Sequence, residues 1–119
     1  MTSDKDLKTL IIEGIHERKG HGVTIIDLSD IETAAASQFI IAEGNNPNQT
    51  AAIAESVGEY VRKNSGVKPY NVDGENTGDW VIMDYGHTWV HIFLPETRVR
   101  YNLEELWSDA PVSHVADLD

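Results

Sequence analysis

Hydrophobic residues recur along the chain with two periods, one typical of helices and one typical of strands. Helical spacing predicts a first helix over residues 5–19, with Ser3 or Asp4 as its N-cap, and a second over residues 47–64 behind an Asn46 cap. The apolar side of the first helix consists of Leu7, Leu10, Ile11, Gly14 and Ile15. Each helix can therefore cover a β-sheet with one apolar face.

Five shorter apolar segments have the length and composition of strands. They cover residues 23–28, 39–42, 67–72, 80–85 and 88–93. Pro69 weakens the third segment, which predicts an edge position or a late start. The connection through Glu32 and three alanines, before the second strand, is predicted to be loop or a single turn. Beyond the last strand, residues 95–101 and 103–107 are each predicted to form a short helix.

The last two strands form a predicted β-hairpin around Gly86 and His87. Gly86 can supply the positive φ that a type II′ turn needs at its first position. Because side chains alternate along a strand, this register gives the hairpin two different faces. One face is mainly aliphatic and carries Val81, Met83, Tyr85, Thr88, Val90 and Ile92. The other combines large aromatic side chains with a carboxylate and an imidazole and carries Trp80, Ile82, Asp84, Trp89, His91 and Phe93.

The order of elements predicts an α+β domain with a mixed β-sheet of about five strands, two main helices and short C-terminal helices. The domain covers residues 1–108, and residues 109–119, which are acidic and include Pro111, are predicted to be a flexible tail. Two main helices can cover only one face of such a sheet. The other face is open, covered by the terminal helices, or used for association. A wide aromatic surface with few polar groups is typical of protein-binding patches, so we expect the aromatic face of the hairpin to be a contact surface.

The bulk composition narrows the possible functions. The chain has 119 residues and no cysteine, which excludes disulfides, thiolate catalysis and cysteine-ligated metals. No apolar run approaches the roughly 20 residues needed to span a bilayer, and the N-terminus does not resemble a secretion signal, so we expect the cytoplasm and no membrane partner. Twenty acidic against nine basic residues give a net charge of −11. Free nucleic acid is then an unfavourable partner and a basic protein a favourable one, although acidity also serves solubility.

Several carboxylates lie near predicted strand ends and could in principle hold a divalent cation. They are Asp27, Asp30, Asp73, Glu75, Asp79 and Asp84. The alternative function is accordingly a metal-dependent nucleotidyltransferase or phosphohydrolase that uses Asp27, Asp30 and Asp73. A nucleotidyl-transfer site, however, needs a Gly-Ser helix entry and two carboxylates that alternate on one strand. The chain has neither, so we predict no enzyme, no cofactor and no metal site.

Other polar residues favour structural roles. His87 and His91 are four residues apart, but a turn and a strand intervene, so they do not form a helical zinc pair. We expect His91 to be a hydrogen-bonded sheet residue. Residues 44–47 precede a helix in the manner of an anion-binding turn, but the segment has no Lys or Arg. Arg98 and Arg100 are expected on a solvated face or in a salt bridge that holds the short helix against the sheet.

The sequence resembles the ribosomal silencing factor family, also called Iojap-like proteins, from about Leu7 to Ser108. The residues that carry the resemblance are 26–28, 39–42, Gly44, 72–75, 79–86, 90–93, 96–98, Tyr101, 103–104 and 106–107. Ser37 and Gln38 depart from the Asp-Tyr that the family usually has before the second strand. His87-Thr88-Trp89 replaces an acidic-then-aliphatic run and makes the hairpin tip more aromatic.

The turn before the second long helix departs further from the family. The family usually has Thr-Gly-x-Ser-x-Arg-Gln there, where this chain has Glu43, Gly44, Asn46, Asn48 and Gln49. A basic residue is lost and an acidic one gained. These departures argue against an anion contact at this turn.

The resemblance implies a nucleotidyltransferase-like fold without the catalytic site. It implies a non-enzymatic factor that binds the large ribosomal subunit through its ribosomal protein fourteen and sterically blocks joining of the small subunit. That action would lower translation during starvation or assist late assembly of the large subunit, and a homodimer is possible. We predict a row of partner contacts at Trp80, Ile82 and Asp84, with Trp89, His91 and Phe93 beside it as further partner-binding residues.

Overall fold

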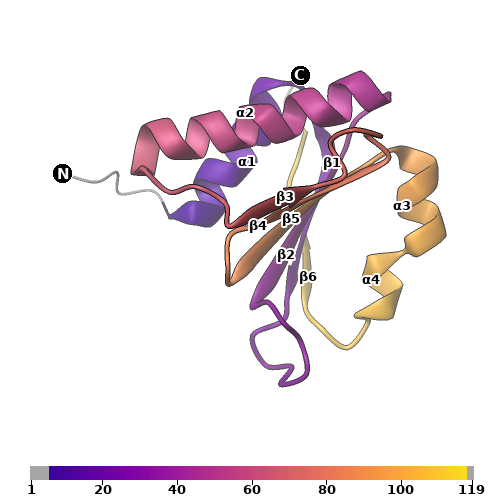
Figure 1. Cartoon of the computed structure of the whole chain (residues 1–119). Coiled ribbons are helices and arrows are strands. Elements are labelled where there is room, and N and C mark those ends of the chain that lie inside the picture. Colours follow the sequence, from indigo (N-terminus) through magenta and orange to yellow (C-terminus); the bar gives the residue numbers. More distant parts are fainter. Residues whose placement is uncertain (1–5, 118–119) are drawn as a thin grey trace.

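A computed structural model of the chain describes residues 6–117 (Figure 1). The helices are α1 (Leu7–Glu17), α2 (Pro47–Ser65), α3 (Pro95–Tyr101) and α4 (Leu103–Leu106). The strands are β1 (His21–Asp27), β2 (Gln38–Glu43), β3 (Asn71–Asp73), β4 (Trp80–Asp84), β5 (Thr88–Phe93) and β6 (Val112–His114). The predicted α+β class is confirmed, and both long helices and the hairpin lie where the sequence pattern placed them.

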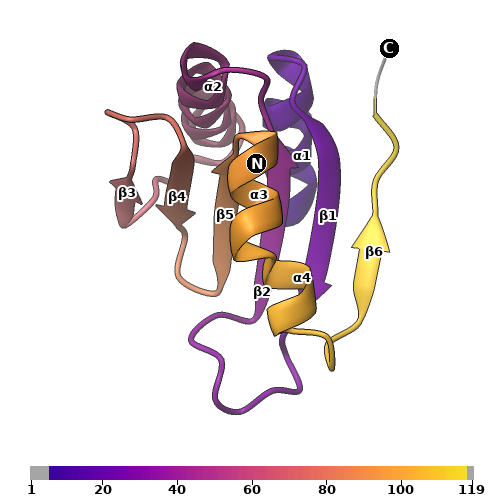
Figure 2. The same cartoon turned by 90° about the vertical axis from the view of Figure 1, so that its right-hand side faces the viewer.

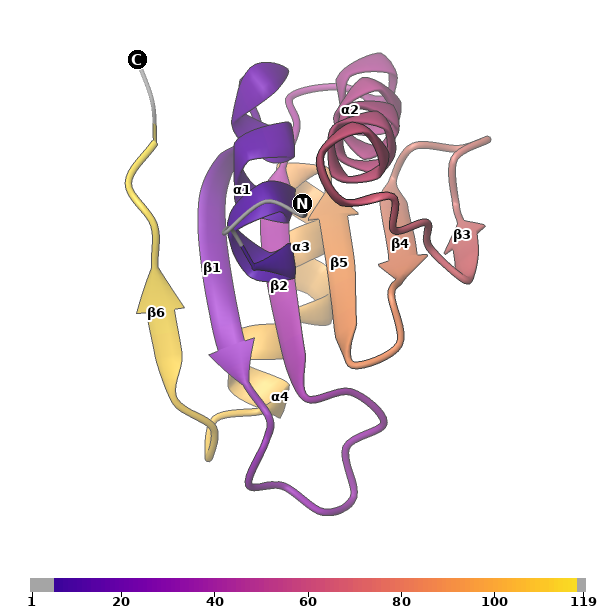
Figure 3. The ribbon, with the colours of Figure 1, turned by 90° about the vertical axis from the view of Figure 1, so that its left-hand side faces the viewer.

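The strands form one sheet in the order β3-β4-β5-β2-β1-β6. The central pair, β2 and β5, is parallel, whereas the other four pairs are antiparallel, so the sheet is mixed. Figure 2 shows α3 and α4 in front of one face of the sheet, and Figure 3 shows α1 and α2 on the opposite face. Of the arrangements considered from the sequence, the structure has the one in which the terminal helices cover part of the second face.

The two long helices are capped by polar side chains of the residues that immediately precede them. Asp6 accepts a hydrogen bond of 2.8 Å from the backbone N–H of Thr9, so α1 begins at Leu7. The predicted caps Ser3 and Asp4 lie outside the described residues. Asn46 caps α2 as predicted, by accepting a bond of 2.9 Å from the N–H of Gln49.

The larger core lies between the sheet and α1–α2. The apolar side of α1 is buried there as predicted, together with one side of α2 and the aliphatic face of the hairpin. Gly14 lets the two helices approach closely, because a Cβ at this position would lie 2.9 Å from the Cα of Val57. A smaller core under α3 and α4 consists of Ile26, Leu28, Ala36, Phe39, Ile41, Phe93, Leu103 and Ala110.

The C-terminal segment differs from the predicted flexible tail. Val112, Ser113 and His114 form β6, which pairs with β1 and makes the sheet six-stranded rather than about five-stranded. The N–H of Asp27 donates to the carbonyl of Pro111, which extends the pairing before the strand. All three β6 side chains are exposed, so their hydrophobic pattern contains no sign of a strand. The strand forms because its backbone pairs with the free edge of β1.

The opposite edge agrees with the sequence pattern. β3 begins only at Asn71, after Pro69, and forms the outer strand of the sheet.

In the part of the chain that the structure describes, no helix is both long and apolar enough to cross a membrane.

Candidate functional site

The β4–β5 hairpin has the predicted register. Trp80 pairs with Phe93, and Asp84 pairs with Trp89 at the other end. Gly86 has a φ of +91°, as the turn requires. The carboxylate of Asp84 accepts a bond of 2.7 Å from the N–H of Gly86, which stabilises the turn from the aromatic face.

Trp80 is the centre of the aromatic face. Its ring stacks on Phe93 with 5.0 Å between centroids, and the ring of Tyr101 from α3 lies 4.7 Å away. The indole Nε1–H donates a hydrogen bond of 3.0 Å to Nδ1 of His91. The indole is therefore held in one orientation by two rings and a hydrogen bond.

His91 is a hydrogen-bonded sheet residue, as predicted. Its Nδ1 accepts from Trp80, which puts the proton of the neutral ring on Nε2. Burial lowers the pKa of His91 to about 4, so the ring is neutral at pH 7. Nε2 is buried and has no hydrogen-bond partner among the described residues. The nearest ring is that of Phe39, at 4.5 Å in an edge arrangement.

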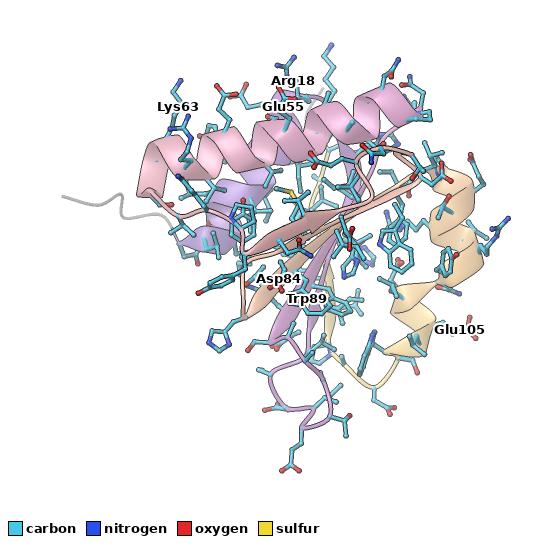
Figure 4. The ribbon with its side chains drawn as sticks, in the orientation of Figure 1. Arg18, Glu55, Lys63, Asp84, Trp89 and Glu105 are labelled. Carbon is cyan, nitrogen blue, oxygen red and sulfur yellow. The ribbon has the colours of Figure 1, made fainter. Side chains whose placement is uncertain are left out.

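The predicted contact residues divide into an accessible and a buried group. His91 and Phe93 have only 3% and 1% of their surface exposed, because neighbouring rings of the sheet and the smaller core cover them. In this structure they support the face from behind and present almost no surface to a partner, which corrects their predicted role as direct contacts. The accessible members are Trp80, Ile82, Asp84 and Trp89, which are half-buried. We call these four residues the contact row; Figure 4 shows Asp84 and Trp89 on the side of the sheet away from α2.

The edge strand β3 extends the accessible part of this face. Asn71 pairs with Asp84 and Asp73 with Ile82, so their exposed side chains share the face with the contact row. Tyr70, which is 82% exposed, lies against the hairpin turn, where a Cβ on Gly86 would be 3.1 Å from its ring. Asn71, Asp73 and Tyr70 are not among the contact residues predicted from the sequence. Only the pairing of β3 with β4 brings them beside the hairpin.

Arg98 fixes α3 on the sheet, as one of its predicted roles required. Its Nη1 donates to the carbonyl of Gly22 at 2.7 Å and to the carboxylate of Glu43 at 2.8 Å. Its Nη2 donates to the hydroxyl of Thr24 at 2.9 Å and to Glu104 at 3.1 Å, and Nε reaches Glu104 at 3.3 Å. The guanidinium thus joins α3 and α4 to β1 and β2.

The carboxylates of the alternative function are not brought together. Asp27 ends β1 and Asp73 ends β3, and three strands separate β1 from β3. At a strand spacing of about 4.8 Å, the two strands are about 19 Å apart. Asp27 instead accepts bonds from Ser29, which lower the pKa of the Asp27 carboxyl. Residues 6–117 contain no group of three or more His, Asp or Glu side chains that could hold a metal ion.

The turn before α2 uses its N–H groups internally. Gln49 accepts from the N–H of Asn45 at 2.6 Å through its side chain, while its own N–H donates to Asn46. Glu43, at the end of β2, is held by Arg98. Of the departures from the family turn, Asn46 thus caps α2 and Glu43 pairs with Arg98.

A mixed sheet that carries an accessible aromatic row on one face has the kind of surface found in protein-interaction domains. The family model described as "Ribosomal silencing factor during starvation" matches residues 2–119. The chain belongs to this ribosomal silencing factor family. Membership confirms that it is a regulatory factor rather than an enzyme.

Individual relatives agree with this assignment. A ribosomal silencing factor from Halalkalibacterium halodurans is 32% identical over 109 residues, which are 92% of this chain and 92% of the relative. A crystal structure of a Chromobacterium violaceum protein has a TM-score of 0.80 at 32% identity and covers 86% of this chain and 83% of that one. A mouse protein named for mitochondrial assembly of the ribosomal large subunit is 26% identical over 101 residues. The match covers 83% of this chain and 44% of the mouse protein.

Proposed function

We propose that this chain binds the large ribosomal subunit through its ribosomal protein fourteen and sterically blocks joining of the small subunit. The observation that carries the proposal is the contact row, which combines large apolar side chains with one carboxylate on a rigid hairpin. Membership of a silencing family and the name of the mouse relative support a ribosomal partner. The bound factor would repress translation during starvation or assist late assembly of the large subunit, in the cytoplasm where ribosomes work.

The contact row is suited to binding because it is already ordered. Trp80 is fixed by His91, Phe93 and Tyr101, so little side-chain freedom is lost when a partner covers it. Asp84 uses one carboxylate oxygen for the turn, and its second oxygen can accept from a basic or hydrogen-bonding group of the partner. A partner that covers Trp80 and Ile82 therefore gains apolar contact, and Asp84 selects its orientation.

Silencing by steric exclusion of the small subunit requires no catalysed reaction by this chain. A bound body of 13.2 kDa that overlaps the position of the small subunit is sufficient to prevent joining. A homodimer is a second proposed use of the same open surface, and it would compete with ribosome binding because both partners cover the contact row.

Co-sedimentation with purified large subunits tests the proposal. We expect the wild-type chain to travel with large subunits and Trp80→Ala to bind about thirtyfold more weakly, since a central tryptophan contributes about 2 kcal/mol or more. Asp84→Asn serves as a second variant, because an amide oxygen can still accept from Gly86 while the charge is lost. Lys63→Ala on α2 is the control, since its side chain lies on the opposite side of the sheet (Figure 4).

If Trp80→Ala folds correctly and binds large subunits with wild-type affinity, the contact row is not part of the interface. A wild-type chain that does not bind large subunits at any concentration would refute the proposed function itself. Circular dichroism checks folding in each case. Sedimentation velocity over a range of protein concentrations shows whether a dimer forms and whether Trp80→Ala disrupts it.

A further inference from the structure

Among the described residues, the excess of negative charge lies outside the α1–α2 layer. The helical layer formed by residues 6–19 and 47–66 carries five acidic and five basic side chains and is neutral. The other described residues carry thirteen acidic against three basic side chains. Their excess of ten negative charges lies on the sheet, its loops and α3–α4, which is the part of the molecule that also carries the contact row.

The short helices α3 and α4 also expose apolar side chains. Val99 is 78%, Leu106 69% and Tyr101 48% exposed. Isolated apolar residues on a surface are common, but three on two helices that together have eleven residues form a concentrated group. Glu96 and Glu105 are exposed on the same two helices, together with the single exposed base Arg100, so carboxylates outnumber basic groups on the exposed side of these helices.

This surface is continuous with the contact row and is rigidly held. The ring of Tyr101 lies 4.7 Å from Trp80, so a partner that covers the row also reaches α3. The Arg98 network ties α3 and α4 to the sheet, and Asn102 caps α4 by accepting from the N–H of Glu105. The helices therefore present a fixed shape to a partner rather than an adaptable segment.

We propose that an α3–α4 surface, formed by Glu96, Val99, Tyr101, Glu105 and Leu106, is a second part of the binding interface and takes a basic polypeptide segment. Lys and Arg side chains suit this surface because their aliphatic stems can cover Val99 and Leu106 while their charged ends reach the carboxylates. The segment belongs to the same ribosomal partner as the contact row, so this inference rests on the proposed function.

The charge asymmetry also determines how such a partner approaches. A basic surface is attracted to the sheet and α3–α4 and gains nothing from the neutral α1–α2 layer. The first encounter is thereby biased towards the face that carries the contact row. The binding partner should accordingly associate faster at low salt, where screening is weakest.

Rates of binding to purified large subunits, measured by surface plasmon resonance at low and physiological salt, test this surface. The double variant Glu96→Gln/Glu105→Gln should associate about fivefold more slowly at low salt, with a smaller difference at physiological salt. Its matched control is Glu55→Gln/Glu59→Gln on α2, which changes the net charge equally and should leave the rates unchanged (Figure 4 marks Glu55 and Glu105). Leu106→Ser should dissociate about tenfold faster, and the exposed position of Leu106 argues against misfolding as the cause.

Every outcome of these measurements either supports or overturns the proposed α3–α4 surface. Equal slowing by both double variants would show that only net charge counts and would overturn the proposed surface. Wild-type dissociation of Leu106→Ser would also overturn it, while the loss of binding by Trp80→Ala would still uphold the proposed function. If Leu106→Ser disrupts self-association and leaves subunit binding intact, the surface belongs to a second copy of the chain and the inference is wrong. A wild-type chain that does not bind subunits would refute both.

Discussion

The indole Nε1–H of Trp80 donates a hydrogen bond of 3.0 Å to Nδ1 of His91, across the β4–β5 pair. The two residues are diagonal neighbours on one face, and the bond joins the accessible contact row to the buried layer behind it. Trp80 is half-buried and offers surface to a partner, whereas His91 is buried and fixes the position of the indole. Their bond therefore links the stability of the domain to the shape of its contact surface.

The first prediction concerns this bond. His91→Phe leaves the Trp80 N–H without its acceptor in a partly buried site, and we expect a loss of about 1–3 kcal/mol in the free energy of unfolding. Urea denaturation of wild type, His91→Phe, Trp80→Phe and the double variant gives the coupling energy of the pair. We expect the double variant to lose less than the sum of the single losses. Strict additivity would show that the bond contributes nothing.

The second prediction is a pH dependence. Because burial lowers the pKa of His91 from 6.5 to about 4, the unfolded chain binds a proton more readily between these values. The folded state is then favoured above pH 6.5 and progressively loses this contribution as the pH falls towards 4. At pH 5 the loss relative to pH 7 is about 2 kcal/mol.

His91→Phe provides the comparison for this pH effect. The variant should lack the His91 component of the loss between pH 7 and pH 5 in urea denaturation. Hydrogen bonds lower the pKa of the Asp6 and Asp27 carboxyls from an ordinary value that already lies below this window. The same pH dependence in wild type and variant would assign the effect to other groups.

The third prediction concerns Arg98. Arg98→Lys retains the charge but cannot reproduce the fork that joins Gly22, Glu43 and Glu104. The side chain is only 11% exposed, so we expect a loss of about 3 kcal/mol in the free energy of unfolding. Arg100→Lys, an exposed neighbour on α3, is the control and should change stability by less than about 0.5 kcal/mol. Equal effects of the two substitutions would contradict the role of the network.

The fourth prediction concerns β6. A chain that ends at Ala110 lacks the strand and exposes the backbone edge of β1, and we expect it to lose about 2–3 kcal/mol through the missing backbone hydrogen bonds. Hydrogen exchange of the Asp27 amide, which donates to Pro111, should accelerate in the same chain. A chain that ends at Asp117 keeps β6 and serves as the control. If the two chains have equal stability, β6 contributes nothing to the fold.

Local patterns in the sequence were sufficient for the long helices and for the hairpin. α2 followed from a cap, Asn46, and an apolar side at helical spacing, both of which act over a few residues. The hairpin register followed from Gly86, because a tight turn determines which residues face each other across it. The two faces of the hairpin could therefore be predicted before any tertiary structure.

Tertiary contacts decided the rest, since they join residues that are distant in the sequence. β6 has no apolar pattern and exists because β1 offers a free edge more than 80 residues earlier in the chain. The burial of His91 and Phe93 depends on rings from other strands and on Leu103 of α4. Arg98 ties α3 and α4 to β1 and β2. Alternation assigns a side chain to a face, but only packing determines how much of that face a partner can reach.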